Sequence, residues 1–178
     1  ISDEHLLHFV LDITKSVAHH GFRKILIVNG HGSNAPILEL AARRTVTETD
    51  ALCGTLAAGS GVDVSQICDS DQLSHADEME TSVYLHLNPD AVQMDKAVEE
   101  TKSPVSDHFW RGWLRGKGNA PVKMMDHWSR ITESGVIGNA TLGTAEKGAR
   151  VFEAAAAALA DIIREFRALP IEPRVDRH

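Results

Sequence analysis

The segment at residues 24–34 constrains the fold of this chain more than any other; its sequence is Lys-Ile-Leu-Ile-Val-Asn-Gly-His-Gly-Ser-Asn. Its run of consecutive branched apolar residues, without polar alternation, predicts a strand buried on both faces, and a helical pattern follows the turn. Residues 51–58, which are small and branched, predict a second buried strand. Because buried strands that alternate with helices pair in parallel through crossover connections, we expect an α/β fold.

The Gly-His-Gly turn lies at the carboxyl end of the first predicted strand. In open α/β sheets ligands bind beyond the carboxyl ends of the strands, and Gly30 and Gly32 would let the backbone approach a ligand closely. His31 is therefore a candidate site residue. The alternative is that His31 is simply a polar residue of a turn, and its position in the sequence does not separate the two interpretations.

A second informative segment covers residues 75–82, His-Ala-Asp-Glu-Met-Glu-Thr-Ser. It predicts a helix that begins just after His75 and ends near Leu87, before Asn-Pro. The imidazole of His75 and the carboxylate of Glu80 could then converge on one point. Acidic residues in a first helical turn also favour the helix dipole, so a purely structural role for Glu80 stays open.

Residues 95–139 have neither a helical nor a strand period, yet they are rich in large rings. A plain solvated loop would not carry so many, so we predict a folded lid or an interface insertion; packing in a core is the alternative. After this segment, Thr144 can cap a long final helix, and residues 171–178 are expected to form a loose tail. The tryptophans of the chain all lie in the insertion, and we predict that they contact substrate: Trp110, Trp113 and Trp128.

Composition excludes several classes of protein. The formal net charge of −7 argues against a nucleic-acid partner, because phosphate binding needs clustered Lys and Arg. The sequence has no apolar run of membrane-spanning length and no signal-peptide pattern, so we expect no membrane partner and a cytoplasmic location. Its two cysteines do not suggest a disulfide framework.

Three motifs together resemble the creatininase (creatinine amidohydrolase) family: residues 29–34, residues 75–82, and Gly-Val-Ile-Gly at 135–138 followed by Thr-Ala-Glu-Lys-Gly at 144–148. The resemblance implies a three-layer α/β/α fold with a mostly parallel sheet, in which residues 1–170 form one partial domain. It also implies one or two divalent metal ions per site, zinc, manganese or iron, and a homo-oligomer, commonly a hexamer.

The resemblance also implies roles for individual residues. His31 falls on a metal-binding histidine of the family, Glu80 on a carboxylate ligand, and His75 on the active-site histidine that handles protons. Neutral imidazole and carboxylate are suitable ligands for a borderline divalent ion. The positions that would shape the substrate pocket are Gly30, Gly32 and Asn34.

These roles imply a metal-dependent hydrolase acting on a small-molecule substrate. We expect metal-bound hydroxide to attack the carbonyl carbon of a small cyclic or amide substrate, with His75 protonating the leaving nitrogen. One alternative is hydrolysis of a carbocyclic ketone such as an oxidised inositol. Another is a non-catalytic assembly subunit or fragment.

The sequence departs from the family pattern in two places. A Glu-x-His motif that supplies further metal ligands is absent, and the chain begins at Ile1 in the pattern of a helix start, so we expect a missing amino-terminal segment of the same protein as a partner. Ser33 stands where creatininase proper has a glutamate. Creatinine itself is therefore a doubtful substrate.

Overall fold

The computed structural model describes residues 1–70, 73–101, 106, 108–111 and 122–175, apart from the side chains of residues 110 and 111. Contacts divide the chain into two compact units. Residues 1–60 and 157–178 form the first unit, and residues 61–156 form the second. Each unit is described by itself.

The first unit alternates helices with strands, as the sequence predicts. Its elements are α1 (Asp3–His19), β1 (Lys24–Asn29), α2 (Ala35–Glu48), β2 (Leu52–Ala57) and the later part of α5 (Ala145–Ala168). The hydroxyl of Ser2 caps α1 by accepting the backbone N–H of His5 at 3.4 Å. Gly21 follows the end of α1 with a φ of 93°, a conformation that glycine adopts without strain.

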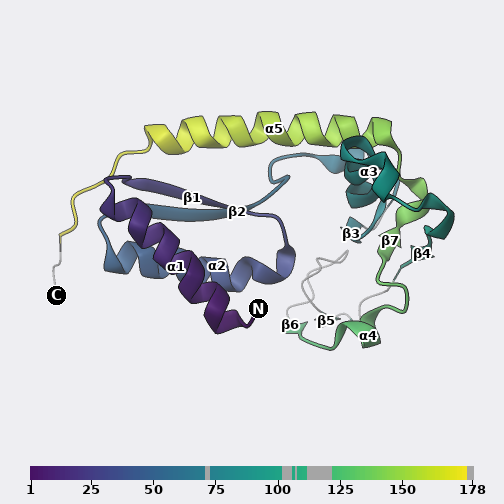
Figure 1. Ribbon diagram of the computed structural model, residues 1–178, viewed down its shortest axis with the longest axis horizontal. Coiled ribbons are helices and arrows are strands. Elements are labelled where there is room, and N and C mark those ends of the chain that lie inside the picture. Colours follow the sequence, from purple (N-terminus) through teal and green to yellow (C-terminus); the bar gives the residue numbers. More distant parts are fainter. Residues whose placement is uncertain (71–72, 102–105, 107, 112–121, 176–178) are drawn as a thin grey trace. The chain divides into compact units, whose positions relative to one another are not determined.

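Strands β1 and β2 pair in parallel, with Lys24 opposite Leu52 and Asn29 opposite Ala57. Helix α2 makes the connection between them, so the predicted crossover unit is confirmed. Figure 1 shows α1 and α2 together on one side of this strand pair. The ammonium group of Lys24 donates to the backbone carbonyl of Arg167 at 2.5 Å, which ties the end of α5 to the start of β1.

Burial on both faces of β1 is not observed in this unit. Val28 is 45% exposed, and Asn29 is the one residue of β1 that is fully buried. Burial of a strand face depends on the elements that cover it, and α1 and α2 both lie on one side of this strand pair. The buried core lies instead between α1 and α2, where the hydroxyls of Thr14 and Thr45 meet at 2.6 Å among apolar side chains: Leu11, Leu38, Ala41 and Ala42.

The second unit holds the elements that the sequence pattern predicts least well. Strand β7 (Ile137–Asn139) is the centre of a three-stranded antiparallel sheet, between β3 (Leu73–His75) and β4 (Glu99–Glu100). Strands this short show no alternation that a sequence could reveal. The other elements of this unit are α3 (Glu78–Leu87), β5 (Phe109–Arg111), β6 (Val122–Met124), α4 (Trp128–Ile131) and the first part of α5, with β5 and β6 paired in parallel.

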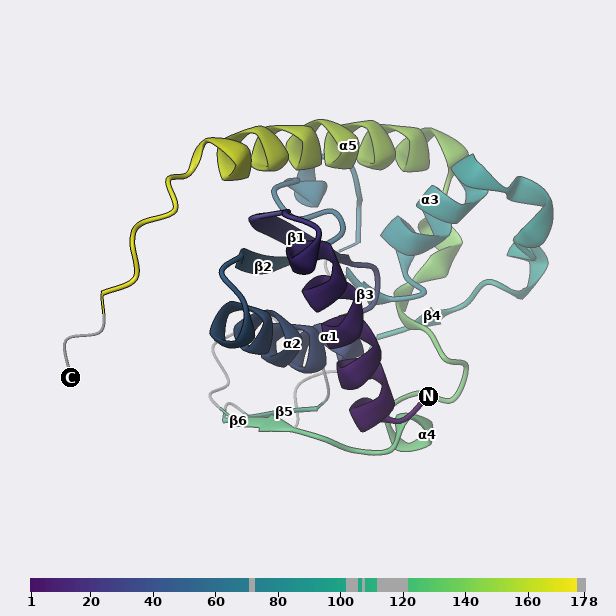
Figure 2. The same cartoon turned by 60° about the vertical axis from the view of Figure 1, so that its left-hand side comes forward.

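Helices α3 and α5 approach closely in the second unit (Figure 2). A Cβ atom added at Gly148 would overlap the backbone carbonyl of Ser82 and lie 2.9 Å from the backbone nitrogen of Val83. The Ser82 hydroxyl accepts the backbone N–H of Thr144 at 3.0 Å, and Thr144 in turn caps α5 through the N–H of Lys147 at 3.2 Å. This packing explains the Thr-Ala-Glu-Lys-Gly motif at the start of α5.

The predicted α/β class and its parallel strand pair are confirmed. The three-layer arrangement stays a prediction, as do the single domain at residues 1–170, the insertion at 95–139 and the loose tail at 171–178. Among the described residues, no helix combines the length and the apolar character needed to cross a bilayer.

Candidate functional site

His31 lies two residues after the end of β1 and precedes a short 3-10 turn over Gly32–Asn34. Its backbone N–H donates to the Asn29 side chain at 3.1 Å, and its carbonyl accepts the N–H of Asn34 at 3.0 Å. The imidazole is exposed and has no hydrogen-bond partner among the described residues. It is therefore available as a ligand at the carboxyl end of the strand.

Gly30 and Asn34 shape the backbone beside His31 without supplying a side-chain contact of their own. A Cβ atom at Gly30 would meet no atom within 4 Å, so packing in this unit does not require glycine there. The Asn34 side chain makes no capping hydrogen bond to α2. A role of Gly30, Gly32 and Asn34 in forming a substrate pocket stays a prediction.

His75 ends β3 and lies opposite Ile137 of β7. Its half-buried ring packs against the indole of Trp128, the first residue of α4, with ring centroids 4.8 Å apart and planes at 77°. Trp128 itself is 38% exposed, so one part of the indole covers the imidazole and another part faces outward. The structure thus brings together two predicted site residues that are far apart in the sequence.

The bend between His75 and α3 fixes the carboxylate of Glu80. Ala76 has a φ of 47°, and it is the one non-glycine residue with positive φ in the described part of the chain. Its backbone N–H donates to Glu80 Oε2 at 2.6 Å, whereas Oε1 of Glu80 has no partner among the described residues. Ligating carboxylates are commonly oriented by a hydrogen bond of this kind, so Glu80 has the arrangement of a ligand.

Asp77 also supports this bend, although the sequence pattern did not indicate it as a site residue. Its fully buried side chain caps α3 by accepting the N–H of Glu80 at 3.0 Å, and it also accepts the N–H of Ser74. Burial raises the pKa of the Asp77 carboxyl. The Asp-x-x-Glu spacing is that of a capping box and could have indicated this role.

A buried ion pair holds the first turn of α3 in place. The fully buried Glu78 carboxylate accepts from Lys147 Nζ at 2.5 Å and from the backbone N–H groups of Asp69 and Ser70 at 2.9 and 2.6 Å. The carboxylates of Asp69 and Glu78 raise the pKa of Lys147. Glu78 and Lys147 are 69 residues apart, so no local pattern predicts their contact.

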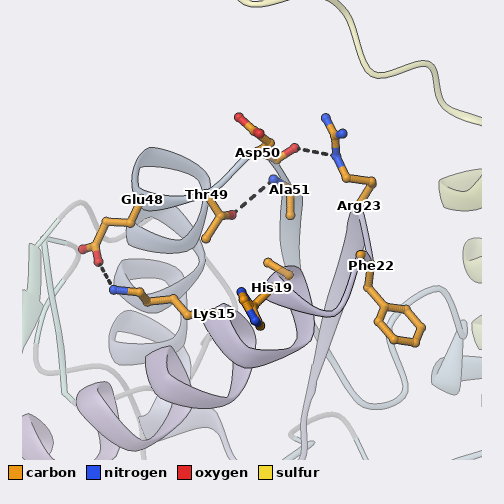
Figure 3. Close-up of a pocket in the computed structure, with 10 residues that line it drawn as sticks. Lys15, His19, Phe22, Arg23, Glu48, Thr49, Asp50 and Ala51 are labelled. Atoms are coloured by element: carbon orange, nitrogen blue, oxygen red, sulfur yellow. Dashed lines mark hydrogen bonds and ion pairs between the residues drawn. The ribbon is translucent and has the colours of Figure 1, made fainter.

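A cavity of about 480 Å³ opens at the other end of the parallel strand pair (Figure 3). Its rim carries an ion pair between Lys15 and Glu48 at 2.8 Å, and Arg23 Nε donates to the backbone carbonyl of Asp50 at 3.1 Å. These residues precede the strands or end the helices, so the cavity lies at the amino ends of β1 and β2. His31 lies at the carboxyl end, and the cavity is not the predicted site.

The comparisons decide the family. The family model described as "Creatininase: Creatinine amidohydrolase" matches residues 1–163. The chain belongs to the creatininase family. A mycofactocin precursor peptide peptidase of Mycolicibacterium smegmatis is 31% identical over 144 residues, which cover 81% of this chain and 50% of that protein.

Solved structures agree with the family. One named "Creatininase Mn" is 25% identical, with a TM-score of 0.71, and the match covers 93% of this chain and 65% of that one. A mutant creatininase of "Zn-Zn type" is 25% identical, with a TM-score of 0.68, over 93% of this chain and 64% of that one. The chain spans about half the length of the curated relatives it matches. Amidohydrolase and peptidase are both names of hydrolytic enzymes, so this is the fold of a family of hydrolases.

In the described part of this creatininase-family chain, the donors available to a metal ion are too few for a closed coordination shell. Among the described residues, no group of three or more His, Cys, Asp or Glu side chains could hold an ion. The free imidazole of His31 and the oriented carboxylate of Glu80 have the right chemistry for manganese or zinc, but His31 belongs to the first unit and Glu80 to the second. A closed coordination shell needs further donors.

Two predicted aromatic contacts fall where side chains are not described. Trp113 lies outside the described residues. The backbone of Trp110 belongs to β5, opposite Lys123 of β6, but its side chain is also outside the description. Of the three tryptophans, only Trp128 can therefore be placed relative to a predicted catalytic residue.

Proposed function

We propose that this chain is part of a metal-dependent hydrolase that cleaves the C–N bond of a peptide or of a small cyclic amide. The observation that carries the proposal is the bend at residues 75–80, where the His75 ring lies under Trp128 and Glu80 is held by the Ala76 N–H. The names of the relatives support the bond type, because an amidohydrolase and a peptidase both hydrolyse an amide.

The side chains named as site residues have separate tasks in this proposal. Glu80 would be a ligand of a divalent ion, which when bound acts as a Lewis acid and lowers the pKa of bound water to about 7. His31 stays a predicted metal ligand of the first unit. His75 transfers a proton to the leaving nitrogen as the C–N bond breaks. Trp128 covers one side of the imidazole and keeps water from it, so the proton is directed toward the substrate.

Metal analysis and a substrate panel test the proposal on the intact protein. We expect near-stoichiometric manganese, zinc or iron and turnover of a peptide or cyclic amide that stops when the metal is removed by a chelator. A non-catalytic assembly subunit would hold no metal and hydrolyse nothing. Turnover of a carbocyclic ketone with no amide hydrolysis would favour the alternative substrate class.

Glu80→Gln is expected to lower metal affinity while leaving the fold intact. Glutamine keeps the hydrogen bond from Ala76 but removes the negative charge. Because loss of a mere outer-shell partner already weakens metal binding by about 10–100-fold, loss of a ligand charge should weaken it by at least tenfold or so. Metal titration of the purified variant measures the effect.

The matched control is Glu146→Gln, which removes a carboxylate from the first turn of α5. If Glu80 only favours a helix dipole, both variants should keep their metal and lose no more than about 1 kcal/mol of stability. Equal metal affinity in the two variants would contradict the assignment of Glu80.

Trp128→Leu is expected to preserve metal binding and lower kcat/KM by roughly 2–10-fold, because the aromatic contact with His75 that it removes contributes about 0.5–1.5 kcal/mol. Steady-state kinetics and a thermal melt of the same variant measure the two effects. Trp128→Phe retains a ring against His75 and is the conservative control. A loss of a few kcal/mol of stability with unchanged kinetics would instead identify Trp128 as a core residue.

Assembly into a hexamer, a cytoplasmic location and a partner segment from the same protein stay predictions. Gel filtration and light scattering of the intact protein would measure its assembly.

A further inference from the structure

Glu100 binds a whole turn through one carboxylate. Its Oε2 lies 2.8 Å from the Thr132 hydroxyl and accepts the backbone N–H and the hydroxyl of Ser134 at 3.0 and 2.6 Å. Its Oε1 accepts the backbone N–H of Glu133 at 3.0 Å. These bonds, led by the Ser134 hydroxyl and followed by the backbone N–H groups, hold the pKa of Glu100 well below its usual range.

The turn that Glu100 binds lies between α4 and β7. Helix α4 ends at Ile131, and the backbone N–H of Thr132 still bonds to the carbonyl of Trp128 at 3.1 Å. Gly135 then reverses the chain with a φ of 91° and donates its N–H to the Thr132 hydroxyl at 3.0 Å. Where this turn lies therefore determines where α4 and its first residue, Trp128, lie.

Glu100 and His75 lie on strands that pair with opposite edges of β7. Glu100 pairs with Gly138 along one edge of β7, and His75 pairs with Ile137 along the other edge. The chain leaves β4 at Glu100 and returns through α4 and the bound turn to β7. Trp128, whose ring contacts that of His75, lies on this connection before the bound turn.

We propose that Glu100 is a positioning residue, which fixes the turn at residues 132–134 and thereby holds the indole of Trp128 against His75. The effect of Glu100 on turnover, but not its effect on the position of Trp128, rests on the proposed role of His75 in proton transfer. Glu100 acts through Trp128 and does not contact the reacting atoms.

A carboxylate suits this position because the groups of the turn that face it, two hydroxyls and two backbone N–H groups, can each donate a hydrogen bond. Glutamine at position 100 would keep one oxygen for Thr132 and Ser134, but its amide nitrogen would face the N–H of Glu133. Alanine would remove the acceptor of the Ser134 hydroxyl and of the backbone N–H groups of Glu133 and Ser134, while the Thr132 hydroxyl could still donate to the Val136 carbonyl at 2.8 Å. The neighbouring Glu99 is exposed and pairs through its backbone with Asn139, so Glu99→Gln is the matched control.

The contact itself can be measured by NMR in the intact, zinc-loaded protein. The signals of the His75 ring protons are identified because they are lost in His75→Gln. The ring-current shift that the indole causes in these signals is identified because it is lost in Trp128→Leu. We expect Glu100→Ala to move the His75 signals to their positions in Trp128→Leu. Glu100→Gln should give a partial shift, and Glu99→Gln should give none.

Kinetics provide a second measurement. Glu100→Ala and Trp128→Leu should lower kcat/KM by similar factors, roughly 2–10-fold, because both remove the same contact. The double variant should lose no more than either single variant, since residues that act through one contact are not additive. Additive losses would overturn the inference.

Two further outcomes are decisive. Unchanged His75 signals in a folded Glu100→Ala variant would overturn the inference; if that variant fails to fold, unchanged signals in Glu100→Gln would do so. A wild-type protein without amide hydrolysis would overturn the proposed function instead, and the His75 signals would still report whether Glu100 positions Trp128.

Discussion

Replacing His75 by glutamine is expected to lower turnover by about 10²–10⁴-fold, the usual contribution of a general acid or base. Glutamine has a similar size and can keep a polar contact under Trp128, but it does not exchange a proton near neutral pH. Metal content should remain near normal, because His75 is proposed to transfer a proton and not to bind the metal ion. Measurements of kcat and of bound metal on the same preparation test both parts.

The control for this variant is His127→Gln, an exposed histidine that directly precedes Trp128. Its turnover should match the wild type. A His75→Gln variant that has lost its metal would identify His75 as a ligand and overturn the division of tasks between His75 and Glu80.

Gly148→Ala is expected to destabilise the second unit by about 3 kcal/mol or more, at or above the usual range for overpacking. The new Cβ would overlap the backbone carbonyl of Ser82, and a backbone atom cannot rotate away as a side chain can. Helix α5 would have to move from α3, which would break the bond between the Ser82 hydroxyl and the Thr144 N–H. Urea unfolding followed by far-UV circular dichroism measures the loss.

Gly54→Ala in β2 is the matched control. There the added Cβ would lie 3.6 Å from Leu26 Cδ1, an ordinary contact, so stability should change by less than about 1 kcal/mol. Similar stability of the two variants would mean that α3 and α5 can separate without loss.

The parts of the fold that the sequence predicts are those defined by neighbouring residues. The apolar run at residues 25–28 and the small, branched residues at 51–58 each depend on a few adjacent positions, and both form the predicted strands, β1 and β2. The partial exposure of Val28 could not be predicted from adjacent residues. Burial depends on which other elements cover a strand, and a local pattern does not contain that information.

In the candidate site, too, the sequence predicts the local features and not the contacts between distant segments. The motif that contains His75 and Glu80 is local, and the structure places both residues at one bend. The buried pair of Glu78 with Lys147 and the bonds of Glu100 to the turn at 132–134 join distant segments. Short strands and an irregular turn make those contacts, and neither has a periodic signature.

The left-handed backbone of Ala76 has a consequence for affinity. An alanine in this region occupies a narrow energy well and has few neighbouring conformations to sample, unlike a glycine at the same φ. The carboxylate of Glu80, bonded to the N–H of this residue, is therefore already oriented before an ion arrives. In the metal site that we propose, an ion would not have to immobilise the bend, so less conformational entropy would be lost on binding and the complex would be correspondingly tighter.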